Sequence, residues 1–110
     1  MLIITARLEL CGIKGVLLLP PPILPHGPNG IIIGNNLSFG KNCILFHHVT
    51  IASGGGQIGD NVLFSAGCTV LSDVKHIGNN AKIGANTIVI EDVPDNATVV
   101  MQKPRVIIRK

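Results

Sequence analysis

Aromatic and charged residues are scarce in this sequence. Its 110 residues include no tryptophan, no tyrosine and three phenylalanines, so any core has to be filled by aliphatic side chains. Charged residues make up 14% of the chain, against about 25% in typical globular domains. Intrinsic disorder is excluded, because 46% of the residues are hydrophobic whereas disordered chains are polar and charged. A chain of this length suffices for one small domain.

The sequence also lacks an apolar run long enough to span a membrane. The longest uncharged apolar stretch, residues 15–25, contains four prolines and is shorter than the roughly 20 residues that a spanning helix needs. A secretory signal would need an unbroken apolar segment near the start, where this chain has Arg7 and Glu9. We therefore expect a cytoplasmic protein without a membrane span.

Cysteines are few and are not spaced as ligands or disulfide partners. The chain has three, Cys11, Cys43 and Cys68, an odd number without a CxxC pair. This spacing indicates neither a disulfide framework nor a zinc ribbon.

Positive charge is concentrated at the C-terminus. Of nine Lys and Arg residues, four lie in the last eight positions, which leaves five basic and six acidic groups in the other 102 residues. A nucleic-acid-binding protein would spread basic residues over one face and, for single strands, supply aromatic rings for stacking. We expect no nucleic-acid partner. The tail is either a solvated terminus or a contact for an anionic ligand.

Large apolar residues recur every six residues, with two single-residue slips before Ile58 and Ile77. The ten anchors are Ile33, Phe39, Leu45, Ile51, Ile58, Phe64, Val70, Ile77, Ile83 and Val89. Six residues rotate an α-helix by about 600°, which would place successive anchors on different faces. Glycine and Asn or Asp follow many anchors, as expected of turns. The pattern predicts short strands joined by turns, three to a coil, stacked as a parallel β-helix with the slips at corners.

Two cysteines fit this register as core residues. Cys43 and Cys68 each lie two residues before an anchor, on the same side of the expected strand. We therefore expect both to be small buried side chains.

Four stretches in this order resemble the hexapeptide-repeat acyltransferases: residues 25–34, 49–51, 83–86 and 91–100, the last followed by Lys103-Pro104. That family includes serine acetyltransferases and O-acetyltransferases of sugars and capsular polysaccharides. The resemblance implies an all-β fold, a left-handed parallel β-helix of hexapeptide repeats with about three to four triangular coils. We expect residues 1–24 to be an extended lead-in or partial coil, 25–94 the β-helix and 95–110 a C-terminal segment with the basic tail.

The resemblance also implies a reaction, the transfer of an acetyl group from acetyl-CoA to a hydroxyl. His26 lies at the start of the repeats, where the serine acetyltransferase-like branch has a His-Gly pair, and it is the expected general base. An upstream acid orients the histidine in that branch, and Glu9 is the acidic residue available here. Serine acetyltransferases have a second histidine in a loop that is short in this chain, at 51–57. The acceptor is therefore left open between serine and a sugar or polysaccharide hydroxyl.

In this family acetyl-CoA lies in a groove between neighbouring subunits, which implies a homotrimer here. The residues that the resemblance assigns to acetyl-CoA are Ser53 and Gly54 near the thioester, Ala66 and Ala85 along the pantetheine arm, and Lys103 and Arg105 near the phosphates. For Ala66 and Ala85 the alternative is an ordinary tight turn.

The other three histidines are expected outside the core. His47 and His48 fall at exterior positions of their hexapeptide and His76 lies at a slip, so solvent-facing or interface roles are favoured. A zinc site like that of γ-class carbonic anhydrases would need histidines four or five residues apart. These residues do not have that spacing, so we expect no metal.

Two further alternatives stay open. The chain is either an enzyme of the shorter sugar-acetylating kind or a truncated form of a longer one. A non-catalytic β-helix scaffold, or a degenerate acetyltransferase, is the alternative to an enzyme.

Overall fold

The computed structural model describes residues 22–34, 37–52 and 56–109. Within these ranges the chain forms eleven two-residue β-strands and no helix. The strands are β1 (Ile32–Ile33), β2 (Ser38–Phe39), β3 (Ile44–Leu45), β4 (Thr50–Ile51), β5 (Gln57–Ile58), β6 (Leu63–Phe64), β7 (Thr69–Val70), β8 (His76–Ile77), β9 (Lys82–Ile83), β10 (Ile88–Val89) and β11 (Thr98–Val99). The described part of the chain contains no helix long and apolar enough to cross a membrane.

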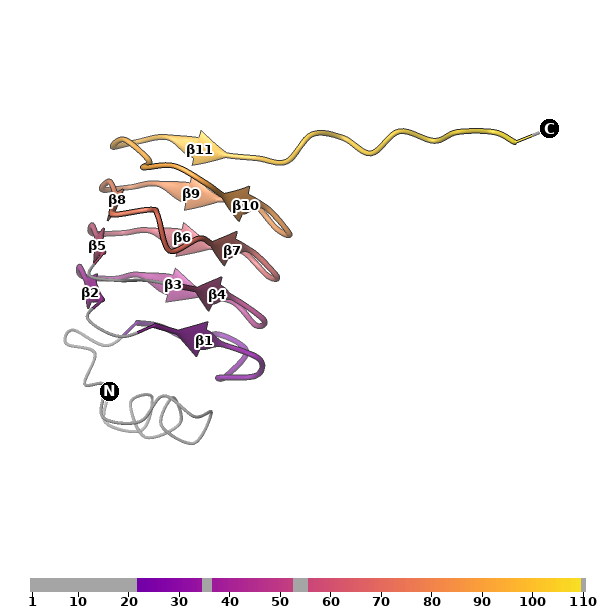
Figure 1. The fold of residues 1–110 in the computed structure, drawn as a ribbon. Helices are drawn as coiled ribbons and strands as arrows, with labels where there is room; N and C mark the ends of the chain where they lie inside the picture. Colours follow the sequence, from indigo (N-terminus) through magenta and orange to yellow (C-terminus); the bar gives the residue numbers. More distant parts are fainter. Residues whose placement is uncertain (1–21, 35–36, 53–55, 110) are drawn as a thin grey trace.

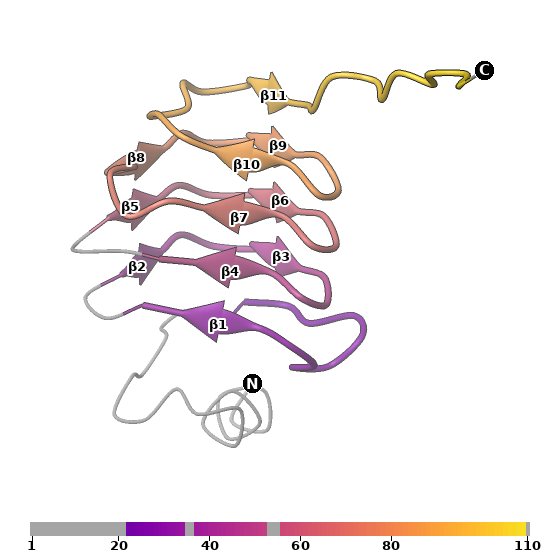
Figure 2. The ribbon, with the colours of Figure 1, turned by 45° about the vertical axis from the view of Figure 1, so that its right-hand side comes forward.

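The strands stack into three parallel sheets, one on each side of a triangular coil (Figures 1 and 2). Their orders are β1-β4-β7-β10, β2-β5-β8 and β11-β9-β6-β3. Isolated parallel bridges between Ile23 and Ile44, and between Ile77 and Val93, extend the pairing at the two ends of the stack. The fold is the left-handed parallel β-helix expected from the sequence, with three complete coils and a shorter fourth.

The period-six register is confirmed strand by strand. All ten anchors are the second residues of β1 to β10, and each is at most 6% exposed. Along one sheet Ile33, Ile51, Val70 and Val89 stack in register, each on the anchor of the preceding coil. Aliphatic layers therefore fill the core, which explains why so few aromatic rings suffice. Both slips fall at one corner, between β4 and β5 and between β7 and β8.

Cys43 and Cys68 are buried free thiols in this core, as expected. Burial raises the pKa of the Cys68 thiol to about 12. Burial is also the main reason that the pKa of Cys43 is raised. Both side chains remain protonated and act as small apolar residues at neutral pH.

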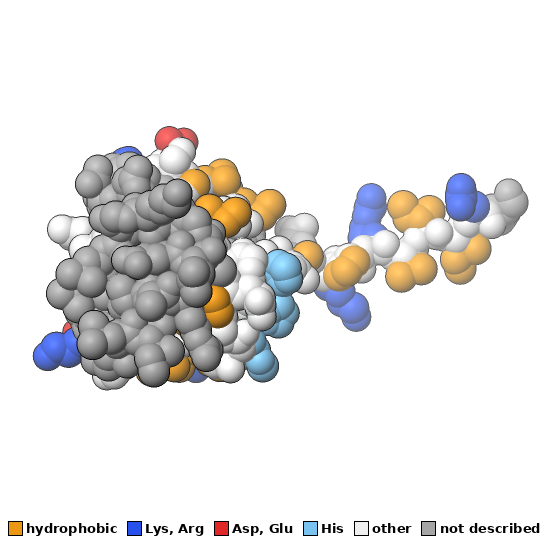
Figure 3. All heavy atoms as spheres, turned by 90° about the horizontal axis from the view of Figure 1, so that it is seen from below, with side chains coloured by type: hydrophobic (Ala, Val, Ile, Leu, Met, Phe, Trp, Pro, Cys, Tyr) orange, Lys and Arg blue, Asp and Glu red, His pale blue; other side chains and the backbone are white. Residues whose placement is uncertain are grey.

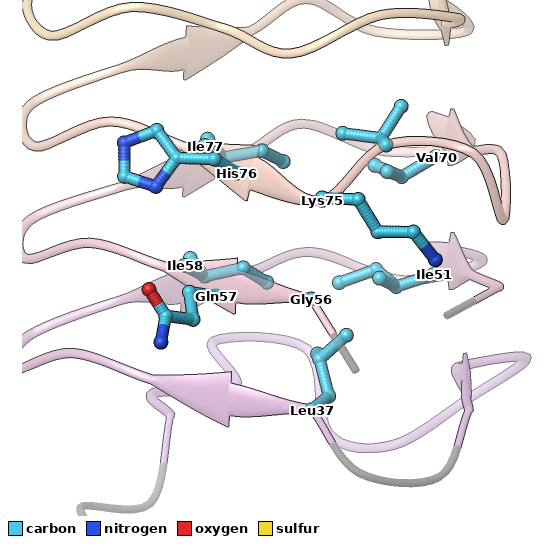
Figure 4. Close-up of a pocket in the computed structure, with 10 residues that line it drawn as sticks. Leu37, Ile51, Gly56, Gln57, Ile58, Val70, Lys75, His76 and Ile77 are labelled. Carbon is cyan, nitrogen blue, oxygen red and sulfur yellow. The ribbon is translucent and has the colours of Figure 1, made fainter. Parts of the chain in front are cut away.

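The corner where the slips occur encloses a narrow apolar crevice (Figure 4). Its walls include Leu37 and the anchors Ile51, Ile58 and Ile77, while the side chain of His76 points away from it. The crevice holds about 10 Å³, which is barely enough for one water molecule. We therefore assign it no substrate.

The corner that follows β2, β5 and β8, here called the asparagine corner, repeats the same chemistry in each coil. It comprises residues 40–42, 59–61, 78–80 and 94–96. The third residue of each turn is an asparagine with φ between 59° and 62°, namely Asn42, Asn61, Asn80 and Asn96. Asparagine tolerates this left-handed conformation better than most residues.

Side-chain hydrogen bonds connect the turns of the asparagine corner. The Asn61 Nδ2 donates to Asn80 Oδ1 at 3.3 Å, and the Asn80 Nδ2 donates to Asn96 Oδ1 at 3.1 Å. One position earlier, Asp60 Oδ1 accepts the backbone N–H of Lys41 at 2.7 Å. These ladders tie each coil to the next along one edge of the stack.

Residues 100–109 form a tail without strands. It continues from β11 away from the stack, on the side where the turns between β3 and β4 and their equivalents project (Figures 1 and 2). The strand β11 pairs with β9, so pairing between coils extends to Val99. The division of the chain into three segments at residues 24 and 94 stays a prediction.

Candidate active site

The corner that follows β3, β6 and β9, here called the histidine corner, comprises residues 25–30, 46–48, 65–67 and 84–86. As at the asparagine corner, the last residue of each turn has positive φ, although the first turn here is longer. These are Gly30 at 67°, His48 at 58°, Gly67 at 75° and Asn86 at 56°. Backbone hydrogen bonds connect successive turns, such as the His48 N–H to Asn29 O at 2.9 Å. Unlike the asparagine corner, this corner does not repeat one residue type at the position of positive φ in every coil.

His26 lies at the first turn of this corner with an exposed side chain. Its ring contacts two residues of the next coil. The ring centroid of Phe46 lies 5.4 Å away at 41°, and that of His47 lies 5.5 Å away at 81°, an edge-on contact. The His26 backbone oxygen accepts a hydrogen bond from Asn29 Nδ2 at 3.2 Å. The expected base is thus accessible to substrate and packed against two neighbouring rings.

An open hollow of about 310 Å³ lies on the same corner. It is lined by His47, His48, Ala66, Gly67, Ala85 and Asn86. The small side chains at Ala66 and Ala85 leave the backbone accessible to a ligand. A row of histidine side chains marks this edge in the view from below, on the side toward which the tail extends (Figure 3).

The structure brings three of the expected site residues to one corner. Ala66 and Ala85 line the hollow, and His26 is connected to it through His47, which contacts His26 and lines the hollow. Lys103 and Arg105 are exposed in the tail and are not among the residues that line the hollow. Glu9, Ser53 and Gly54 lie outside the described residues.

Sequence reasoning did not single out His47 as a site residue. A signal was available, because His47, Ala66 and Ala85 occupy the same position of successive coils. By position alone, His47 is therefore as close to the expected ligand as Ala66 and Ala85 are. His76, by contrast, lies in β8, on a sheet away from this corner.

No family model and no curated protein sequence matches the chain. Several solved structures do. The chain resembles serine acetyltransferase isoform 3 from Entamoeba histolytica, in complex with cysteine, with 25% identity and a TM-score of 0.68 over 94% of this chain and 41% of that one. It resembles serine acetyltransferase from Neisseria gonorrhoeae with 36% identity and a TM-score of 0.65, over 74% of this chain and 35% of that one.

A complex of the Neisseria gonorrhoeae enzyme with serine matches with 31% identity and a TM-score of 0.59, over 89% of this chain and 45% of that one. The chain thus spans less than half the length of these structures. The coil, the period-six register and the structural neighbours agree with the resemblance found in the sequence. Together they show that the chain is similar to the hexapeptide-repeat acyltransferases, the serine acetyltransferases among them.

Proposed function

We propose that this chain is an acetyl-CoA-dependent O-acetyltransferase that acts on the hydroxyl of a small molecule or saccharide. The serine acetyltransferase neighbours support an acetyltransferase. The observation that carries the specific proposal is the position of His26, exposed and in ring contact with His47, which lines the hollow together with small residues such as Ala66 and Ala85. The same corner can therefore supply both a base and room for an acyl donor.

In the proposed reaction the neutral imidazole of His26 takes the proton of the acceptor hydroxyl as that oxygen attacks the thioester carbonyl carbon. A carbon–oxygen bond forms, the carbon–sulfur bond breaks, and the imidazolium returns the proton to the departing CoA sulfur. Negative charge develops on the carbonyl oxygen during the attack. A backbone N–H of a nearby turn would stabilise it. The proposed reaction requires no metal ion.

Acetyl-CoA would lie along the histidine corner. Ala66 and Ala85 would face its pantetheine arm, because small side chains let an extended ligand approach the backbone. We assign Lys103 and Arg105 to the CoA phosphates, since the tail that carries them extends on the same side. Ser53 and Gly54 near the thioester, and Glu9 as the acid that orients His26, complete the proposed site.

The proposed assembly is a homotrimer. Large aliphatic side chains are exposed on or beside the sheet β1-β4-β7-β10, among them Ile32, Ile88 and Ile90, which are 60–65% exposed. Covering such side chains with another copy would remove apolar surface from water. The acyl donor would then lie between two copies. The cytoplasmic location stays a prediction.

An assay of CoA release tests the function and the acceptor together. Purified chain is incubated with acetyl-CoA and, separately, serine or one of several sugars, with His26→Ala as the control. The proposal expects turnover with one acceptor class and its loss in the variant. If the protein shows neither turnover nor a thermal shift on adding acetyl-CoA, the non-catalytic scaffold is favoured instead.

A further inference from the structure

We propose that His47 is a positioning residue that holds the imidazole of His26 for proton transfer. This inference rests on the proposed function, because it assigns a partner to the proposed base. An exposed histidine on a turn can adopt several rotamers, and a base must lie within hydrogen-bond distance of the proton that it takes. Some part of the protein therefore has to restrict the His26 ring.

The contacts that restrict it come from the next coil. Phe46 and His47 are consecutive residues of one turn, and both rings contact His26, the first tilted and the second edge-on. The two turns are also joined through Asn29. Its backbone oxygen accepts the His48 N–H at 2.9 Å, and its Nδ2 donates to the His26 backbone oxygen at 3.2 Å. The backbone of the first turn is thus fixed relative to the rings that contact His26.

His47 is itself packed against the next residue. The ring of His48 lies 5.3 Å from that of His47 at 78°, again edge-on, and its Nδ1 occupies the space where a Cβ on Gly30 would lie. His48 has a left-handed φ of 58° at a position where other coils have Gly30, Gly67 and Asn86. Non-glycine residues are uncommon at such φ values, and they concentrate at functional sites. His48 therefore adds a second ring contact to His47.

His47 also lines the hollow, so two roles have to be separated. A wall of the acetyl-CoA groove would affect the KM for acetyl-CoA. A positioning residue would affect kcat, because small displacements of a reacting group slow the chemical step strongly. The two rings are nearly perpendicular to one another, so a phenylalanine at this position would keep most of the contact.

Kinetics with three variants separates these roles. His47→Ala should lower kcat about tenfold to 100-fold, with the KM for acetyl-CoA within about twofold of wild type. His47→Phe should recover most of the loss, and His76→Ala, which removes a histidine far from the corner, should have no effect. The proposal is overturned if kcat is unchanged, if only KM changes, or if His47→Phe is as slow as His47→Ala, which would indicate a chemical role for the imidazole.

A second measurement does not depend on turnover. The chain has four histidines, so their ring signals can be assigned in histidine-labelled protein by NMR. His47→Ala should shift the ring signals of His26 more than His76→Ala does, because a ring contact is lost. If they do not shift, the positioning role is wrong even when the enzyme is active. If the His26 signals shift but the wild-type protein shows no turnover, the proposed function is wrong, whereas the ring contact between His26 and His47 is confirmed.

Discussion

The turns of the asparagine corner and of the histidine corner all end in a residue with positive φ, but their side chains differ. At the asparagine corner each coil repeats a left-handed asparagine, and side-chain hydrogen bonds connect it to the next coil. At the histidine corner the equivalent positions change from glycine to histidine to asparagine, and the turns border a hollow. Repetition at one corner stabilises the stack, so the other corner is free to vary and to carry chemistry.

The largest effect is expected at His26. His26→Ala should lower the rate of CoA release by about 10²-fold to 10⁴-fold, the usual contribution of a general base. The melting temperature should stay close to that of wild type, because the side chain is exposed. If the variant lost stability instead, His26 would have a structural role and not a catalytic one.

A matched pair of glycines compares the two corners directly. Gly59 follows an anchor at the asparagine corner, and an added Cβ would collide with Asn79 Oδ1 and lie 2.8 Å from the Asn79 backbone nitrogen. Gly84 follows an anchor at the histidine corner, where the nearest atom to an added Cβ is Val99 O at 3.1 Å. Gly59→Ala should cost about 1–3 kcal/mol of unfolding free energy, and Gly84→Ala clearly less. Denaturant unfolding measures both, and equal costs would contradict the division.

Substitutions at the positive-φ positions of the two corners should change the free energy of unfolding in opposite directions. Asn80→Ala removes two hydrogen bonds of the ladder and a residue suited to its φ of 62°. It should cost about 1–2 kcal/mol. His48→Asn places an asparagine at a φ of 58° and should stabilise by a few tenths of a kcal/mol up to about 1 kcal/mol. Thermal unfolding tests both signs, and a destabilised His48→Asn would show that the histidine packing outweighs the backbone strain.

The smallest effect concerns the buried thiols. Because the pKa of Cys68 is raised to about 12 from an ordinary value of 9.0, its contribution to stability is fully present below pH 9. It is lost as the pH rises from there toward 12. At pH 8 the folded Cys11→Ser variant, which retains Cys43 and Cys68, should react slowly with iodoacetamide and rapidly once denatured. Mass spectrometry counts the modified thiols, and fast labelling of folded protein would contradict their burial.

The sequence predicted the coil well because its core has a simple period. All ten anchors are buried strand residues, since a side chain that points inward in a stacked strand has to be large and apolar. The handedness of the coil came only from the family resemblance, because a six-residue spacing of apolar residues does not distinguish a left-handed from a right-handed β-helix. The length of the C-terminal pairing was harder to predict. The spacing of the inward-facing residues changes in the fourth coil, yet Val99 still pairs with Ile83.

The site was only partly predictable, because a six-residue period says which side chains point inward and little about the corners. His26 was found through the glycine and aliphatic residues that follow it. His47 was treated as an exterior residue, although it stacks with Ala66 in the next coil, and the slip between them obscured this relation. Glu9, Ser53 and Gly54 lie outside the described residues, so their roles stay predictions.

The two slips have a consequence for how such a chain can change in length. Successive anchors are six residues apart along two edges of the coil, from Phe39 to Leu45 to Ile51 and in the later coils. From Ile33 onward the third edge absorbs every difference, with a seven-residue step from Val70 to Ile77 and a four-residue step from Val89 to the bridge residue Val93. Codons can therefore be gained or lost at that edge, for example between Leu71 and Lys75, while the histidines keep their places. An engineer adding a peptide tag or a recognition loop within the repeats would choose the same edge.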